Sequence, residues 1–183
     1  MQLNKRLLTS VIMIIVSMVF AAGATLALLA SLAGPVENEF TIGNVRISLN
    51  ETTGSDYSLI PGKEIEKDPC VTVKGGSEDC WLYVKLTKSG EFDEHLSFAL
   101  EDGWLHLNGV DGVYYRQVVK AGGDSLFPVL QGNIITVSDM LTEEKMRNIA
   151  VAPSLTVKAY AIQCEGVEDA MIGWLRIQEE VAR

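Results

Sequence analysis

An uncharged apolar run near the N-terminus constrains this chain more than any other feature. Lys5 and Arg6 form a short basic start, and no charged residue then occurs from residue 7 to residue 33. A basic start, an apolar run and small residues near its end are the three parts of a secretory signal peptide. Residues 1–33 are therefore predicted to direct export, and the folded part is expected to begin after them.

The end of the apolar run offers two cleavage points. Thr25-Leu26-Ala27 and Ser31-Leu32-Ala33 both place small side chains one and three residues before the cut, as signal peptidases require. The alternative is a retained membrane anchor, since about 20 apolar residues span a bilayer. Gly34-Pro35 follows directly and favours cleavage, after Ala27 or after Ala33. Only an uncleaved segment would then hold the protein at a membrane.

The mature chain is acidic and has the size of one domain. Removing Lys5 and Arg6 from the 183-residue sequence leaves 13 basic against 24 acidic residues, a net charge of −11. A surface of this charge repels phosphate backbones and anionic lipid, so nucleic acid is not an expected partner. Residues 36–183 are expected to form a single domain with its own core.

Most of this domain reads as short strands separated by turns. In the first expected strand, the apolar residues of Phe40-Thr41-Ile42 point to one side, and those from Val45 to Leu49 point to the other. The alternation therefore shifts by one residue, a phase slip at Gly43-Asn44 that a β-bulge or a tight turn would produce. Gly75 to Asp79 reads as a turn into the strand Cys80–Thr87, and a simple hairpin here would turn near Ser77. Further strands are expected at 96–100, 104–107, 113–119, 126–130, 134–137 and 155–163.

Two helices interrupt the strands. Ser138 or Thr142 is expected to cap a short helix ending at Ile149, and a second helix follows Gly166. Its apolar face is predicted to contain Val167, Ala170, Met171, Trp174, Leu175 and Val181. Many short strands at regular spacing predict an all-β fold, a jelly-roll-like β-sandwich with a few short helices.

Three cysteines in an exported protein allow at most one intramolecular disulfide. In a hairpin turning near Ser77, Cys70 and Cys80 would not face each other, whereas a Cys80–Cys164 bond requires their two strands to be neighbours. The alternative is three reduced thiols that pack as small apolar residues. Both interpretations stay open.

The sequence contains no familiar catalytic motif. His-Glu-x-x-His, Gly-x-Ser-x-Gly and the phosphate-binding glycine patterns are all missing. His95 and His106 are the only histidines. Glu94-His95 and His106 could be brought together with a carboxylate such as Asp93 or Glu101 to bind zinc, but ordinary surface or core positions in strands are the simpler interpretation. The acidic run from Glu91 to Glu94 reads as a solvated loop. Neither an enzyme nor a cofactor or metal site is predicted.

Five aromatic residues of the expected strands could form a binding platform. A carbohydrate or peptide could stack on them, although aromatics at strand spacing more often cover a core. They are Trp81, Tyr83, Trp104, Tyr114 and Tyr115.

The order of several blocks resembles the TasA/camelysin-like family of exported Gram-positive proteins with a SipW-type signal peptide. Gly23-Ala24-Thr25-Leu26-Ala27 is similar to the Gly-Gly-Thr-x-Ala ending of the family's signal, and Val36 to Val45 is similar to its first mature strand. Matching blocks follow at Pro61-Gly62-Lys63, at Lys67 to Lys74, at Trp81 to Leu86, at Asp111 to Tyr115 and at Leu155 to Gln163.

The resemblance implies a jelly-roll sandwich and processing by a dedicated signal peptidase. TasA is a fibre subunit of biofilm matrix, and camelysin has been described as a surface metallopeptidase, but no metal ligand can be carried over to this chain. The chain is therefore expected to be a secreted or cell-surface structural protein whose partners are copies of itself, the signal peptidase and other matrix proteins. A monomeric surface binding module and a metallopeptidase are the alternatives.

Cleavage after Ala27 would create an apolar arm at the new N-terminus. Such an arm is costly in water and could pair with an open sheet edge of another subunit, as the donor strands of TasA-like fibres do. If cleavage occurs after Ala33, no such arm remains. The expected assembly residues are Leu28, Leu29, Leu32, Phe40 and Ile42.

Overall fold

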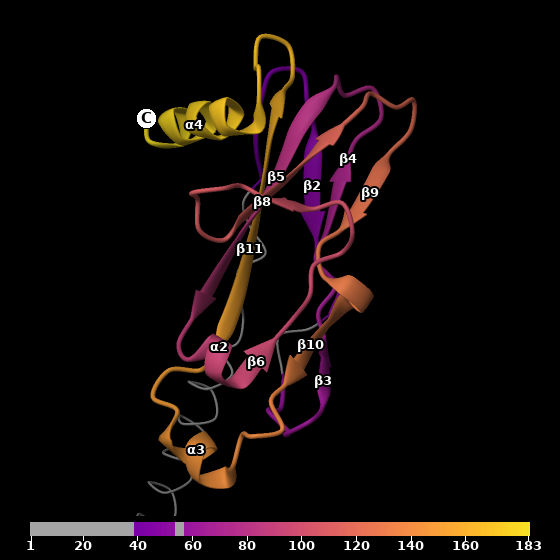
Figure 1. Cartoon of the computed structure of the whole chain (residues 1–183). Coiled ribbons are helices and arrows are strands. Elements are labelled where there is room, and N and C mark those ends of the chain that lie inside the picture. The colour runs from indigo at the N-terminus through magenta and orange to yellow at the C-terminus, as the bar shows by residue number, and fades with distance from the viewer. Residues whose placement is uncertain (1–38, 54–56) are drawn as a thin grey trace, which may run out of the picture. The chain divides into compact units, whose positions relative to one another are not determined.

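The computed structural model describes residues 39–53 and 57–183, and these belong to one compact unit, Gly34–Arg183 (Figure 1). The predicted signal peptide 1–33, its cleavage points Ala27 and Ala33, and the assembly residues Leu28, Leu29 and Leu32 lie outside the described residues. Within the described ranges, no helix is both long enough and apolar enough to cross a membrane. The described part is mostly β structure with a few short helices.

Two ten-residue strands form the centre of a five-stranded sheet. β5 (Cys80–Ser89) and β11 (Ser154–Gln163) pair antiparallel along their whole length, from Cys80 opposite Gln163 to Ser89 opposite Ser154. β1 (Glu39–Ile42) pairs parallel to β11 at one edge, and β8 (Val113–Val118) and β7 (Leu105–His106) follow on the other side of β5. The strand order is β1-β11-β5-β8-β7.

A second layer consists of two three-stranded sheets. One has the order β2-β4-β9, with β2 (Ile47–Asn50), β4 (Cys70–Val73) and β9 (Ser125–Pro128). The other has the order β3-β10-β6, with β3 (Glu64–Glu66), β10 (Ile134–Val137) and β6 (Leu96–Ser97). β3 runs into β4, and their partners β9 and β10 are joined by the 3-10 helix η1 (Gln131–Asn133), so the two sheets continue each other.

The main core lies between the five-stranded sheet and this second layer. Alternate residues of β5, such as Leu82 and Val84, are fully buried in one cluster with Val71 of β4 and Val137 of β10. The opposite face of β5 is also covered, since Tyr83 is fully buried in the second cluster. The layered, mostly β arrangement agrees with the predicted β-sandwich.

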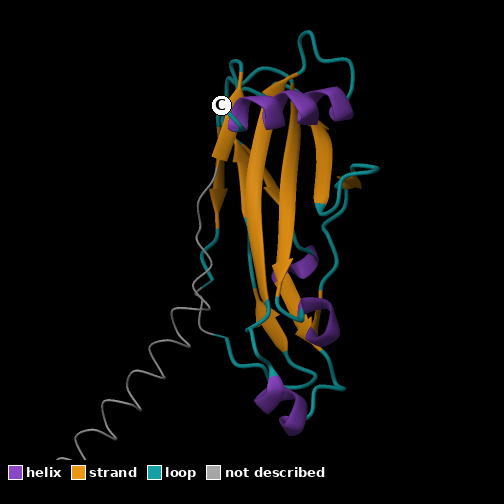
Figure 2. Ribbon diagram, turned by 90° about the vertical axis from the view of Figure 1, so that its left-hand side faces the viewer, coloured by secondary structure: helices purple, strands orange, loops and turns teal. Residues whose placement is uncertain are grey.

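The opposite face of the five-stranded sheet carries α4 (Ala170–Val181), which runs across the ends of the strands (Figure 2). The carboxylate of Asp169 caps this helix by accepting a hydrogen bond from the Ile172 amide at 2.8 Å. The predicted apolar face was partly wrong, because Leu175 and Val181 are 54% and 51% exposed. The buried residues are Ala170, Gly173, Trp174 and Ile177.

The phase slip at Gly43-Asn44 marks a crossing between the layers. β1, before it, belongs to the five-stranded sheet, and β2, after it, belongs to the second layer. Gly43 has a φ of 88°, a region that favours glycine, and an added Cβ would lie 2.8 Å from the Cβ of Gln163. The Asn44 amide donates to Oε1 of the same Gln163 at 3.0 Å, which fixes the crossing.

The hairpin near Ser77 was a wrong prediction. β4 and β5 lie in different sheets, so the turn from Gly75 to Asp79 also carries the chain from one layer to the other. Ser77 is buried there, and its hydroxyl accepts a hydrogen bond from the Arg46 amide at 3.1 Å. β3 was not predicted either.

The short helices were predicted only in part. The Thr142 cap was predicted correctly: its hydroxyl accepts from the Lys145 amide at the start of α3 (Glu143–Asn148). In contrast, α2 (Phe92–His95) occupies the acidic run that was predicted to be a loop.

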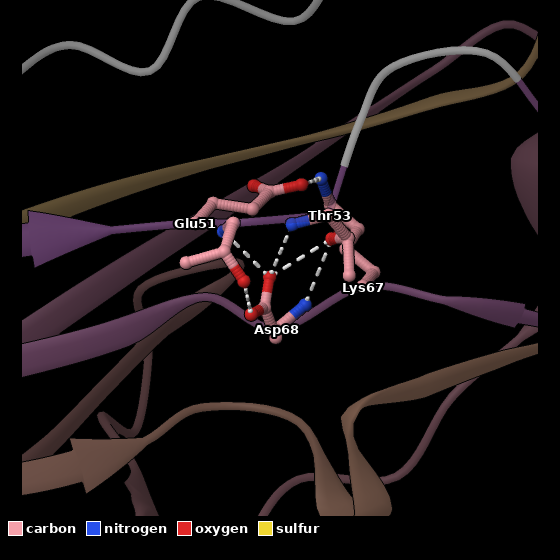
Figure 3. A network of polar contacts seen from close by, with 5 residues as sticks. Glu51, Thr53, Lys67 and Asp68 are labelled. Atoms are coloured by element: carbon pink, nitrogen blue, oxygen red, sulfur yellow. Dashed lines mark hydrogen bonds and ion pairs between the residues drawn. The ribbon is translucent and has the colours of Figure 1, made fainter.

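A carboxylate clamps the loop after β2 to the segment between β3 and β4 (Figure 3). Asp68 accepts hydrogen bonds from the backbone amides of Thr52 and Thr53, at 2.8 and 2.9 Å, and from both threonine hydroxyls. Lys67 pairs with Glu51 at 2.6 Å beside it. Burial raises the pKa of Asp68, but the four hydrogen bonds outweigh it and lower the pKa well below its usual value.

Asp68→Asn is expected to reduce the free energy of unfolding by about 1–2 kcal/mol at pH 7, because the amide replaces a charged acceptor of four bonds. A carboxyl group whose pKa is lower in the folded protein stabilises the fold. This stabilisation is fully present above the pKa of the unfolded chain, about 3.9, and is lost as the pH falls toward the pKa of the folded protein. Urea denaturation at pH 7 and pH 3 should therefore show a smaller difference between the two proteins at pH 3. Glu66→Gln, at an exposed neighbouring site, is the matched control; an equal effect there would contradict the clamp.

Candidate functional site: the open edge of the five-stranded sheet

Within the described residues, a strand covers only part of β11 on the side opposite β5. β1 pairs with Ala159 to Ile162, while among residues 39–53 and 57–183 no strand pairs with Ser154 to Lys158 on that side. In a strand, backbone N–H and C=O groups point alternately to both sides, so this stretch presents a row of them at an edge. Such an edge is a template on which a further strand can add.

The side chains of this stretch alternate between core and surface. Leu155 and Val157 are each 7% exposed and belong to the main core, whereas Thr156 and Lys158 lie on the other face and are half-buried. Lys158 lies directly opposite Lys85 of β5. A lysine at a sheet edge discourages unspecific pairing with other strands.

Phe40 and Ile42, predicted as assembly residues, pair within their own chain. Phe40 lies opposite Tyr160 and Ile42 opposite Ile162, and both pack against the cluster under α4. Because β1 is parallel to β11, the open stretch lies beyond the N-terminal end of β1. The structure thus brings these two residues to the strand that carries the open edge, although they are not free themselves.

The three cysteines are free thiols. β5 and β11 are neighbours, as a Cys80–Cys164 bond requires, and Cys80 lies opposite the residue before Cys164. The sulfur of Cys164, however, accepts from the Gln117 side-chain amide at 3.8 Å, and burial raises the pKa of Cys80 to about 12. Cys80 is therefore an unreactive core thiol in this state, Cys70 lies apart in β4, and a disulfide stays a prediction.

The five aromatic residues do not share one surface. Tyr83 and Trp104 are buried, and their polar atoms donate to the backbone oxygens of Ala170 and Pro128, each at 2.8 Å. Trp104 and Tyr114 belong to the main core, whereas Trp81, Tyr83 and Tyr115 pack on the α4 side of the sheet. Covering the two cores accounts for all five.

The two histidines lie on separate elements. His106, in the edge strand β7, packs against the ring of Tyr114 with 5.3 Å between the ring centroids. His95, in α2, is only 4% exposed, and its Nε2 lies 3.1 Å from Oε2 of Glu91. Among the described residues, His106 and the suggested carboxylates Asp93 and Glu101 do not join His95 in a metal-ligating group.

No family model, curated protein or solved structure matches this chain.

Proposed function

We propose that this protein is an exported structural subunit of the TasA/camelysin-like type, with a jelly-roll topology, that assembles outside the cell by strand addition. The open stretch of β11 from Ser154 to Lys158 supports this proposal most directly, because a fibre of this kind needs one sheet edge that accepts a strand. Its backbone groups are available in the described structure, and its core-side residues Leu155 and Val157 would meet apolar side chains of an incoming strand.

The donor would be the apolar arm that cleavage after Ala27 leaves. Burial of a leucine side chain contributes about 1.5–3 kcal/mol, so the three leucines at positions 28, 29 and 32 would supply a large driving force for pairing. Each subunit would keep its own β1 on β11 and accept the arm of its neighbour beside it. Head-to-tail pairing of this kind builds a filament wherever the rotation between subunits does not close into a ring.

The mature chain starting at Leu28 is expected to form filaments, and the chain starting at Gly34 is expected to remain monomeric. Both contain the whole described part, so their circular dichroism spectra should agree. Electron microscopy and sedimentation velocity measure the difference. A matched variant of the longer chain, with Leu28, Leu29 and Leu32 replaced by serine, should behave like the shorter chain.

A synthetic peptide of residues 28–39 should slow filament growth by occupying the open edge, whereas the same peptide with Asp at positions 29 and 32 should not. Equal assembly of the Leu28 and Gly34 chains would refute strand donation by the arm. If filaments grow at the same rate with the peptide present, another surface must join the subunits.

A further inference from the structure

Three side chains of metal-ligating types converge at α2. Glu91, Glu94 and His95 are spaced i, i+3 and i+4, which brings them to one side of a helical turn. The nearest ligand atoms of the three all lie within 4.8 Å of one another. The imidazole is buried, while both glutamates are exposed.

The backbone and core fix the histidine in this position. Phe92, on the same turn, is buried at 2% exposure. The carbonyl oxygen of His95 accepts a hydrogen bond from the Ser138 amide at 2.8 Å, which ties the end of α2 to the segment after β10. The Nε2 atom is therefore held toward the carboxylates before any ligand arrives.

The charges around the three side chains favour a cation. Lys88 is paired with Asp93 at 2.6 Å, and no described residue forms an ion pair with Glu94. An open hollow of about 660 Å³ beside them is lined by four acidic side chains and two lysines. The carboxylate of Glu91 contacts the imidazole, and Glu91 and Glu94 both line a net negative hollow, an arrangement that a bound cation would stabilise.

The ligand types select the kind of cation. Imidazole nitrogen together with carboxylate oxygen suits Zn²⁺ and its first-row neighbours, whereas Ca²⁺ and Mg²⁺ prefer oxygen alone. Bonds of about 2.1 Å in a tetrahedron place ligand atoms about 3.4 Å apart. The 3.1 Å between Nε2 of His95 and Oε2 of Glu91 is close to this value, and rotation of the exposed Glu94 can bring in the third ligand.

We propose that Glu91, Glu94 and His95 form a Zn²⁺ site with three protein ligands, the fourth position being open to water from the hollow. The bound ion would join the turn before α2 to its last residue and so brace the connection between β5 and β6. The site does not depend on strand donation, since none of its residues lies on β1 or β11.

Titration of the full chain with ZnCl₂ by isothermal calorimetry is expected to show one saturable site. Glu94→Gln and Glu91→Gln should each weaken binding by at least about tenfold, because even the outer partners of metal ligands are worth about 10–100-fold. Asp93→Asn is the matched control: it removes one negative charge from the same hollow but no ligand, so its effect should stay below about threefold. Co²⁺ should give a visible absorption band in the wild type that weakens in the two ligand variants.

His95→Gln should abolish Zn²⁺ binding. If this variant of a buried residue fails to fold, the Zn²⁺ affinities of the Glu91→Gln and Glu94→Gln variants test the proposal instead. The proposal would be overturned by the absence of saturable Zn²⁺ binding. It would also be overturned if Asp93→Asn weakened binding as much as Glu94→Gln, because the hollow would then attract cations only through its overall charge.

Discussion

Gly173→Ala is expected to reduce the free energy of unfolding by about 1–3 kcal/mol, although alanine is the better helix former by about 1 kcal/mol. A Cβ on Gly173 would overlap the hydroxyl oxygen of Tyr83 and lie 3.1 Å from Cγ2 of Ile162. The missing side chain allows α4 to lie close enough for the Tyr83 hydroxyl to donate to the Ala170 carbonyl at 2.8 Å. Urea denaturation followed by circular dichroism measures the loss.

A double-mutant cycle with Tyr83→Phe tests the cause. Alone, Tyr83→Phe removes the hydrogen bond to Ala170 and should cost about 1 kcal/mol. In the Gly173→Ala background it also removes the overlapping oxygen, so the double variant should be more stable than Gly173→Ala alone. Strictly additive free energies would contradict the packing argument. Leu175→Ala, on the exposed side of the same helix, should change stability by less than about 0.5 kcal/mol.

The same glycine explains why the apolar face of α4 was predicted only in part. The predicted apolar face included Leu175 and left out Ile177. In the structure, the buried face begins at Ala170 and follows the spacing i, i+3, i+4, i+7, which includes Gly173 and Ile177. Gly173 contributes no hydrophobicity to a pattern, yet its lack of a side chain determines which side approaches the sheet. Apolar content alone therefore could not orient the helix.

Local patterns predicted strands well and their partners poorly. The positions of β5 and β11 follow from residues within each strand, and the slip at Gly43-Asn44 was visible as a change of phase. Whether a turn joins two strands of one sheet or crosses between sheets depends on distant partners. β4 pairs with β2 and β9, so the turn at Gly75 to Asp79 could not form the simple hairpin that its composition suggested.

The same limit applies to the two candidate sites. Among the described residues, β1 pairs parallel to β11 and covers only four of its ten residues, a length mismatch that no local pattern contains. In α2, the spacing of Glu91, Glu94 and His95 was present in the sequence. A helix of four residues is too short to give a periodic signal, so the acidic run was predicted to be a solvated loop.

Phe92→Ala is expected to reduce the free energy of unfolding by about 3–5 kcal/mol, because this ring is among the largest fully buried side chains of the described structure. It meets the ring of Phe98 edge-on, with 5.9 Å between the centroids. The Lys88 ammonium lies 5.6 and 5.2 Å from the centroids of the two rings, which adds a cation–π contribution. Thermal and urea denaturation measure the effect.

Phe92→Leu, which keeps most of the apolar volume, should lose considerably less, and Asp93→Ala, exposed on the same turn, should lose less than about 1 kcal/mol. A four-residue helix is not stable by itself, so the packing of Phe92 is what holds α2 in place. If Phe92→Ala is still folded, Zn²⁺ affinity should fall with it, since all three proposed ligands belong to this turn. Equal stability of Phe92→Ala and Asp93→Ala would mean that α2 is held by the backbone hydrogen bond from Ser138 to His95 instead.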